Sequence, residues 1–266
     1  MASAACQHWP EYLIEAAGLG GFMIAAGGLA TLLEHPASPV RQVVGSALLR
    51  RALMGTGMAA TAMALVYSPW GKRSGAHFNP ALTLTFLRLG KVALWDALFY
   101  VLAQFIGGLL GLLLLGAALG PALADPHVSH VATVPGPGGP WPAFVAEAAM
   151  SFVLMATVLT LTNIRAAARY TGLAVGALLL LYITFEAPLS GMSINPARTI
   201  ASAVSAWRWD AIWVYFTAPP LGMLLAAELY QFLRGGRGVL CAKLHHHNSQ
   251  RCIFRCSWAS DPGMPG

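Results

Sequence analysis

Two stretches of the sequence repeat each other: Ser74-Gly75-Ala76-His77-Phe78-Asn79-Pro80-Ala81-Leu82-Thr83 and Ser190-Gly191-Met192-Ser193-Ile194-Asn195-Pro196-Ala197-Arg198-Thr199. Ser, Gly, Asn, Pro, Ala and Thr recur at the same positions in both. Asn caps the first turn of a helix, and Pro fits the first helical position because its missing N–H would have no partner there. Each stretch therefore predicts a short helix that begins at Asn-Pro-Ala. Matched short helices in two halves of a membrane protein indicate a transport site between the halves.

The rest of the chain is apolar enough for a membrane. Of its 266 residues, 57% are hydrophobic and 10% are charged, whereas a soluble domain carries about 25% charged residues. A bilayer is crossed by a helix of roughly 20 apolar residues. The predicted spans are Tyr12–Leu33, Leu48–Tyr67, Ala93–Leu119, Phe144–Thr162, Thr171–Pro188 and Ala211–Phe232.

The basic residues are placed as in a membrane protein, although a net charge of +6 could suggest a nucleic-acid partner. With both termini cytoplasmic, eleven of the 16 Lys and Arg residues fall inside and five outside, in agreement with the positive-inside rule. No nucleic-acid partner is therefore expected. The short loops fit a multi-pass protein of a bacterial inner membrane. All four cysteines would then face the reducing side, where thiols or metal ligands are expected rather than disulfides.

An internal repeat divides the chain. The halves, about 10–119 and 142–234, open on matching Pro, Glu and Ala residues. Each half contains three spans, so the second half enters the membrane from the opposite side and the two Asn-Pro-Ala segments meet near the midplane. We expect a channel domain over residues 1–236 and a cytoplasmic tail over residues 237–266.

The chain resembles the aquaporin, or major intrinsic protein, family over about residues 10–234. The resemblance rests on the two complete Asn-Pro-Ala motifs, on Glu15 and Glu147 early in each half, and on the six-span inverted repeat. It implies an all-α membrane protein with six transmembrane helices and two re-entrant half-helices. It also implies a passive water channel that excludes ions and protons, and a homotetramer with one pore per subunit.

The resemblance assigns roles to the motif residues, which are Asn79, Pro80, Ala81, Asn195, Pro196 and Ala197. The two asparagine amides would donate hydrogen bonds to a passing water, and the positive ends of the half-helices would oppose cations. Glu15 and Glu147 would anchor the backbone N–H groups of the loops, with a proton relay as the alternative. His77 would line the pore mouth, with a pH-sensing role as the alternative.

Four residues are expected to form the narrowest part of the pore. Counted from the second motif, they are Arg198, Met192 and Ile183, with Ala59 at the corresponding place in the second span. Thr199, where the glycerol-conducting branch usually has Asp, favours water, and so do Ala203 and the pair Tyr215-Phe216. The apolar filter leaves glycerol, hydrogen peroxide and ammonia as alternative solutes.

The tail carries a separate set of soft ligands: Cys241, His245, Cys252 and Cys256. A tetrahedral zinc site needs this inventory, although close cysteine pairs in such sites are usually nearer in sequence. We therefore expect either a metal- or redox-responsive appendage, or a disordered basic tail beside anionic lipid. No other cofactor is expected.

Other classes of protein fit the sequence less well. A membrane enzyme or a metal or redox sensor would have to use the tail, because the spans contain no nucleotide loop and no nucleophile with a partner base. Coupled ion transport would need a charged midplane site. The sequence therefore predicts a channel and no enzyme, with water as permeant and the lipid bilayer as its surroundings.

Overall fold

The computed structural model describes residues 2–235 and 238–258, and every regular element in this part of the chain is helical. The first half contains α1 (Ala2–Glu34), α2 (Pro39–Val43), α3 (Ala47–Tyr67), α4 (Pro69–Ser74), α5 (Pro80–Arg88), α6 (Leu94–Leu119) and α7 (Pro121–Ala124). After η1 (Ser129–Val131), the second contains α8 (Pro140–Thr162), α9 (Arg165–Ala168), α10 (Thr171–Leu181), η2 (Tyr182–Glu186), α11 (Ala187–Ser190), α12 (Pro196–Ala206) and α13 (Ile212–Leu233).

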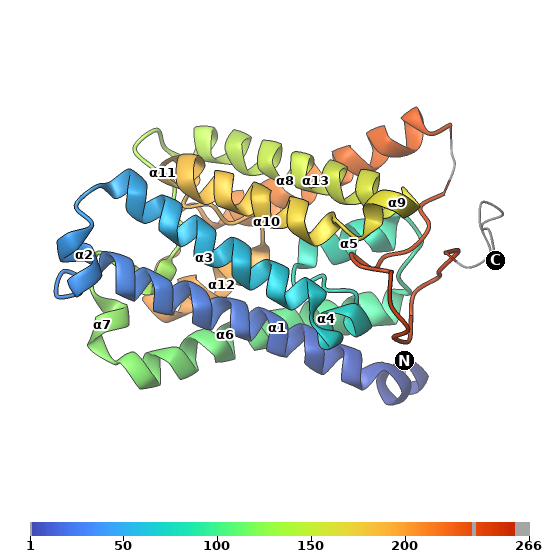
Figure 1. Cartoon of the computed structure of the whole chain (residues 1–266), viewed down its shortest axis with the longest axis horizontal. Helices are drawn as coiled ribbons and strands as arrows, with labels where there is room; N and C mark the ends of the chain where they lie inside the picture. Colours follow the sequence, from blue (N-terminus) through green and yellow to red (C-terminus); the bar gives the residue numbers. More distant parts are fainter. Residues whose placement is uncertain (1, 236–237, 259–266) are drawn as a thin grey trace.

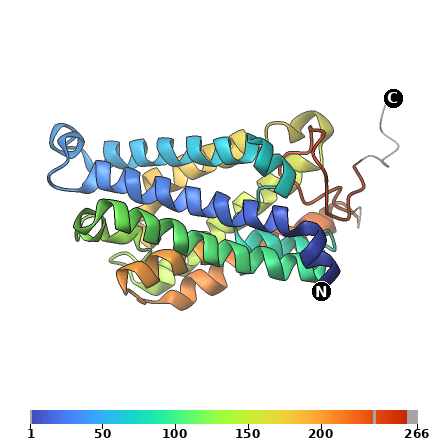
Figure 2. The same ribbon diagram turned by 90° about the horizontal axis from the view of Figure 1, so that it is seen from below.

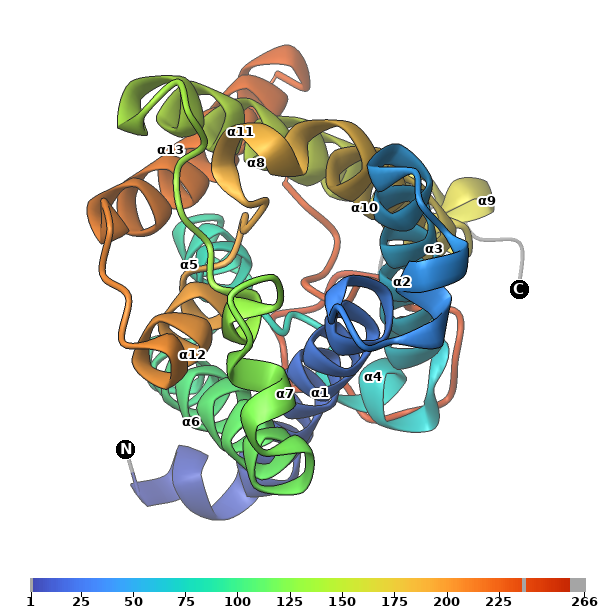
Figure 3. The same cartoon turned by 90° about the vertical axis from the view of Figure 1, so that its left-hand side faces the viewer.

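The long helices lie side by side along the long axis of the molecule (Figure 1). Five helical segments of the described chain are long and apolar enough to cross a membrane: α1, α6, α8, the run α10–η2–α11, and α13. The sixth predicted span is α3, which has 21 residues and carries Arg50 and Arg51 near its start. Viewed along the long axis, the long helices surround a centre (Figure 3).

The inverted repeat is visible in how the helices pair. In the first half α1 packs on α6, in the second α8 packs on α13, and α3 packs on α10 between the halves. Glycine allows the helices of two of these pairs, α1 with α6 and α8 with α13, to approach closely. A Cβ on Gly107 would lie 2.1 Å from the carbonyl oxygen of Ala16, and a Cβ on Gly222 would lie 2.1 Å from that of Ala148. Small residues of this kind let membrane helices approach closely.

The two Asn-Pro-Ala segments begin the short helices α5 and α12, which pack between α6 and α13. The Asn79 side chain accepts a hydrogen bond from the N–H of Ala81 at 2.9 Å. Asn195 accepts from Ala197 at 3.1 Å and from Arg198 at 3.3 Å. Both asparagines have extended backbones, so the Asn-Pro sequence starts each helix by capping it.

After α13 the chain returns to the end of the bundle where α1 begins (Figures 1 and 2). Residues 238–258, here called the tail, lie against the bundle, with Val239, Ala242, Leu244 and Phe254 buried. Arg251 donates to the carbonyl oxygen of Gln7 at 3.1 Å. The tail expected from the sequence also includes residues 237 and 259–266, which lie outside the described part of the chain.

Candidate functional site

A cavity of ≈ 290 Å³ runs through the centre of the bundle, between the two halves of the repeat. One part of its wall comes from the loops before α5 and α12, and the facing part comes from α1, α3, α8 and α10. The lining residues are Leu19, Phe22, Ala26, Glu34, Arg51, Met54, Met58, Ala62, Leu65, Val66, Ala76, His77, Phe78, Asn79, Leu82, Val131, Ala132, Leu154, Val158, Val175, Leu179, Ile183, Ala187, Gly191, Met192, Ser193, Ile194, Asn195, Arg198 and Leu244.

The two Asn-Pro-Ala segments meet beside this cavity. Asn79 Nδ2 donates to the carbonyl oxygen of Ile194 at 2.7 Å, and Asn195 Nδ2 donates to that of Phe78 at 2.8 Å. Each asparagine therefore holds the loop of the opposite half, a link that the sequence did not predict. A side-chain amide carries two N–H donors, so each asparagine has a second donor at the cavity wall. The positive N-terminal ends of α5 and α12 face the same region.

Glu15 and Glu147 lie behind the loops, and both side chains are completely buried. Glu15 accepts hydrogen bonds from the Ser74 hydroxyl at 2.8 Å and from the backbone N–H groups of His77 at 3.1 Å and Phe78 at 2.6 Å. Its second oxygen also accepts from Gln104 at 2.8 Å.

Glu147 makes the equivalent contacts in the second half. It accepts from the Ser190 hydroxyl at 2.6 Å and from the N–H groups of Ser193 at 2.7 Å and Ile194 at 2.6 Å. The repeat thus extends to the individual hydrogen bonds that shape each loop.

These loops carry residues in the left-handed backbone region. Ala76 and Phe78 have φ values of 59° and 46°, and the matching residues Met192 and Ile194 have 50° and 49°. Bulky residues rarely adopt this conformation, and it persists only where the surroundings enforce it. The carboxylates of Glu15 and Glu147 provide that constraint because they bind the N–H groups of the same loops.

Two tyrosines support the loops from behind, and sequence reasoning gave them no such role. Tyr100 donates to the carbonyl oxygen of Ser74 at 2.6 Å, and Tyr215 donates to that of Ser190 at 2.6 Å. The signal was present, because Tyr100 and Tyr215 stand seven residues before the paired glycines Gly107 and Gly222.

His77 lines one end of the cavity, but the protein engages both of its ring nitrogens. Nδ1 lies 3.0 Å from Thr83 Oγ1, and Nε2 lies 2.9 Å from the carbonyl oxygen of Ala242 in the tail. The ring is stacked between Phe86 and Phe254, with centroid distances of 5.3 Å to each. His77 thus connects the first loop to the tail.

Three of the four residues expected in the narrowest part line the cavity: Ile183, Met192 and Arg198. Ala59 does not, and its neighbour Met58 does. Successive helix residues point about 100° apart, so an error of one residue turns the side chain out of the pore. The separate helix α4 lies between α3 and Asn79, so counting residues back from Asn79 could not establish which side chains of α3 face the cavity. Met58, Ile183, Met192 and Arg198 therefore line the cavity, and Ala59 does not.

The residues used to distinguish water from glycerol lie away from the cavity. Thr199 is buried and its hydroxyl bonds to Ser193 at 2.6 Å and to Thr133 at 2.8 Å. Ala203 is buried, Tyr215 holds the second loop, and Phe216 is 40% exposed. None of the four positions lines the cavity, so they make no contact with a solute there.

Charged groups occupy one end of the cavity. Arg198 lines it, with one long protein hydrogen bond from Nη1 to Ser202 at 3.4 Å. Arg51 and Glu34 also line it, and sequence reasoning did not place them there. Arg51 Nε donates to the carbonyl oxygen of Thr184 at 3.1 Å. By contrast, Glu186 is absent from the lining, and neither of its oxygens has a hydrogen-bond partner among the described residues.

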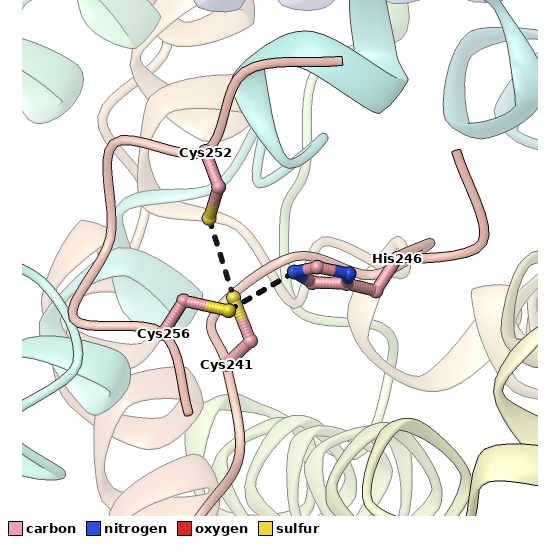
Figure 4. A group of neighbouring side chains, drawn as sticks. All are labelled: Cys241, His246, Cys252 and Cys256. Atoms are coloured by element: carbon pink, nitrogen blue, oxygen red, sulfur yellow. Dashed lines mark hydrogen bonds between the residues drawn. The ribbon is translucent and has the colours of Figure 1, made fainter. Parts of the chain in front are cut away.

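The tail brings together Cys241, His246, Cys252 and Cys256, a set we call the tail cluster (Figure 4). Their ligand atoms all lie within 4.8 Å of one another. The sequence pointed to His245, which the structure instead places with its ring edge-on to Tyr67 at 5.1 Å. Spacing could not choose between adjacent histidines, because this segment is irregular and has no fixed period. A hydrogen bond with Cys241 lowers the pKa of the Cys252 thiol, as does the nearby Lys243 ammonium.

Comparisons with known proteins agree with this architecture. The family model described as "Major intrinsic protein" matches residues 5–230. Aquaporin NIP2-1 of Oryza sativa subsp. japonica is 33% identical over 195 residues, which are 72% of this chain and 63% of that protein. Nodulin-26 of Glycine max is 36% identical over 171 residues, 64% of this chain and 61% of that protein.

The solved structure of the aquaglyceroporin from Plasmodium falciparum superposes with a TM-score of 0.67 at 19% identity, covering 84% of this chain and 96% of that one. This match concerns the fold. The chain spans less than two thirds of the length of the curated relatives it matches. Those relatives are plant proteins, so they give no support to the expected bacterial inner membrane.

The family consists of multi-pass membrane channels for small molecules, which agrees with a helical bundle around a cavity and with the prediction that the protein is no enzyme. With its paired Asn-Pro-Ala half-helices, buried loop glutamates and inverted repeat, the chain belongs to the major intrinsic protein family.

Proposed function

We propose that this protein is a passive channel for water. The observation that carries the proposal is the meeting of Asn79 and Asn195 at the cavity wall, each with one amide hydrogen used to bind the opposite loop. The remaining amide hydrogen of each residue can donate to the oxygen of a water in the cavity. Such a water turns its own hydrogens outward and interrupts the donor–acceptor chain that a proton would follow.

Two features would exclude ions. The N-terminal ends of α5 and α12 together place a partial positive charge of roughly half an elementary charge per helix at the same region. Arg198 lines the cavity and adds a full positive charge. Among the described residues its guanidinium makes one hydrogen bond, from Nη1 to Ser202 at 3.4 Å, which leaves its other donors available to the cavity. A cation would therefore meet two barriers in succession.

A second candidate, a channel for small uncharged solutes such as glycerol, is favoured by the chemistry of the wall. Met58, Ile183 and Met192 are apolar, while Arg198 and the asparagines provide donors. A wall of this kind suits a solute with hydroxyl groups and C–H groups. Hydrogen peroxide and ammonia are smaller members of the same class.

The surroundings of the channel follow from the same proposal. Both termini, and with them the tail, would lie on the cytoplasmic side of a cell membrane, where the positive-inside rule places the basic residues. A homotetramer with one pore per subunit would cover part of the exposed apolar surface, to which Leu102, Ile106 and Leu110 on α6 contribute. The channel domain over residues 1–236 and the tail would form two functional parts.

Stopped-flow light scattering on proteoliposomes tests the proposal. Vesicles containing the protein should shrink faster than empty vesicles after an osmotic step, and the same vesicles should then be compared in glycerol. A membrane-permeant metal chelator should be included in parallel, because the tail lies at one end of the cavity. Water flux equal to that of empty vesicles under both conditions would contradict the proposal.

The position of Met58 in the cavity wall gives a separate prediction. Met58→Ala should raise the ratio of glycerol to water permeability several-fold, since it removes three heavy atoms from an apolar wall of the cavity. Met63→Ala is the matched control on the same helix, because Met63 does not line the cavity and instead packs near Gly176. Both ratios are read from stopped-flow traces. Equal ratios for the two variants would mean that Met58 does not limit the passage of solutes.

A further inference from the structure

We propose that the tail cluster binds one Zn²⁺ and that the metal holds the tail across the cytoplasmic end of the pore, which closes it. The metal site stands on the geometry of the tail alone. The closing of the pore also rests on the function proposed above.

The arrangement of the ligand atoms fits zinc. In tetrahedral sites the Zn–S distance is about 2.3 Å, so neighbouring ligand atoms lie about 3.8 Å apart. In the tail cluster, Cys241 Sγ lies 3.5 Å from Cys252 Sγ, and His246 Nε2 lies 3.1 Å from Cys256 Sγ. All four atoms lie within 4.8 Å of one another, and Figure 4 shows the side chains converging from separate turns of the tail.

The charge around the cluster also suits this metal. Three cysteine thiolates and one Zn²⁺ carry a net charge of −1, which favours a nearby cation when the site is partly buried. Lys243 supplies it: the residue is 1% exposed, and no carboxylate in the described chain forms an ion pair with it. Its ammonium donates to the carbonyl oxygens of Gln250 at 3.0 Å and Arg251 at 2.7 Å. Lys243 thus connects the two ligand-bearing segments.

His246, the one histidine of the tail cluster, is held in position by its neighbours. The His246 ring is stacked on Trp258 with centroids 4.8 Å apart and planes at 17°. The backbone N–H of Trp258 lies 3.4 Å from Cys256 Sγ, and a hydrogen bond to a ligand sulfur orients it for the metal. Arg165 on α9 lies over the Trp258 ring at 5.2 Å, which ties this side of the cluster to the bundle.

The residues between the ligands contact one end of the cavity. Ala242 and Leu244 stand between Cys241 and His246, and Phe254 stands between Cys252 and Cys256. Leu244 lines the cavity, and its N–H donates to the carbonyl oxygen of Gly75 at 3.1 Å.

Ala242 and Phe254 both contact His77 in the loop before the first Asn-Pro-Ala motif. The Ala242 carbonyl oxygen lies 2.9 Å from His77 Nε2, and the Phe254 ring is stacked on the His77 ring with planes at 6°. The segments that touch the pore are therefore the ones whose ends the metal would fix.

A metal acts on this contact by ordering the tail before it docks. All four ligands belong to the tail, so zinc can fold the segment without any residue of the bundle. A pre-ordered segment loses less conformational entropy on docking than a flexible one. Loss of zinc would raise that entropy cost and release Leu244 and Phe254 from the end of the cavity, so zinc and docking favour each other.

The metal site is tested on the full-length protein purified in detergent, by elemental analysis of zinc and by titration of thiols. We expect about one Zn²⁺ per chain and close to none in Cys252→Ser or His246→Ala. Cys6→Ser and His245→Ala are the matched controls, because Cys6 is exposed on α1 and His245 packs on Tyr67. Both controls should retain the metal, and Co²⁺ should give a tetrahedral thiolate spectrum in wild type.

Two results would overturn the metal site. One is a wild-type protein without zinc in which Cys241 and Cys252 form a disulfide after purification under air and take up no Co²⁺ after reduction. The other is zinc that remains bound after both Cys252→Ser and His246→Ala.

The closing of the pore is tested by water flux in proteoliposomes. Stripping zinc with a membrane-permeant chelator should raise the water permeability of wild type about tenfold, which is within the usual range of coupling between two sites. Added Zn²⁺ should reverse the change. Phe254→Ala should keep its zinc but show the high permeability with and without metal, because the stack on His77 is lost.

Equal permeability with and without zinc, in a protein that binds one Zn²⁺ per chain, would overturn the closing of the pore. Background permeability in every variant, stripped Phe254→Ala included, would instead contradict the channel function proposed above. Zinc content is measured independently of flux, so the two failures are distinguishable.

Discussion

Glu147→Gln is expected to destabilise the protein by about 3 kcal/mol and to reduce water flux to near background. The carboxylate accepts hydrogen bonds from Ser190, Ser193 and Ile194 in a fully buried site. A glutamine keeps one oxygen acceptor, but its N–H₂ group takes the place of the other oxygen. At least one of these three donors then faces a second donor and has no acceptor. A buried donor left without an acceptor costs about 1–3 kcal/mol, and a lost bond to a charged acceptor about 1.5–3 kcal/mol. The saved cost of burying a charge offsets part of this loss.

The loss should extend to function because of the loop that Glu147 holds. Met192 and Ile194 adopt left-handed backbone conformations beside it, and such strained residues relax when the constraint is removed. Asn195, which follows them, then loses its position at the cavity wall. The prediction is measured by thermal unfolding in detergent, followed by size-exclusion chromatography, and by stopped-flow water permeability.

Glu186→Gln is the matched control for this substitution. Glu186 lies in the fifth membrane-spanning segment, yet neither of its oxygens has a hydrogen-bond partner among the described residues. Replacing it breaks no hydrogen bond found among the described residues, and a neutral amide costs less to bury than an ionised carboxylate, so stability should stay the same or increase. If the two variants unfolded at the same temperature, the loop contacts of Glu147 would contribute nothing beyond burial of its charge.

The parts of the fold that the sequence predicts are those with local or periodic signals. Asn-Pro-Ala at the start of α5 and α12 encodes its own cap, and a span of apolar residues encodes a membrane helix without reference to the rest of the chain. The pairing of Glu15 with the first loop was expected for a different reason, namely the resemblance to the aquaporin family, which assigns the early glutamates to the loops. The structure shows matching contacts for Glu147 and the second loop.

Details that depend on helix phase or on irregular backbone were not predictable. Ala59 and Met58 differ by one residue, and only the packing of α3 on α10 shows which side chain faces the cavity. In the tail, His245 and His246 stand four and five residues after Cys241, and the fold of this irregular segment decides which ring reaches the sulfurs. Contacts such as Asn79 to Ile194 join the two halves and have no local signal.

A further gap between sequence and structure concerns the choice of solute. Thr199 and Tyr215 differ in a recognisable way between branches of the family, but here they support the second loop from behind and touch no cavity. Residues that vary with function need not contact the solute. Any choice between solutes inside the cavity is therefore made by the residues that line it, among them the charged Arg198.

Arg198→Leu is expected to raise proton permeability, relative to water permeability, by roughly 100-fold. Two unit charges about 4 Å apart repel by about 4 kcal/mol at the effective dielectric constant of a protein, and each 1.36 kcal/mol corresponds to a factor of ten in rate. The full effect would be roughly 1,000-fold. The N-terminal ends of α5 and α12 keep part of the barrier in the variant, so we expect a smaller increase.

The measurement is the decay of a pH gradient in proteoliposomes, divided by the water permeability of the same vesicles. The vesicles are stripped of zinc for both measurements, so that the proposed closing of the pore by the tail limits neither flux. Arg208→Leu is the control, because Arg208 is an exposed arginine that pairs with Asp210 and lies away from the cavity. An unchanged ratio in Arg198→Leu would place the barrier to protons entirely at the two asparagines and the half-helix ends. Arg198 would then serve to bind solute hydroxyl groups, for which it has donors facing the cavity.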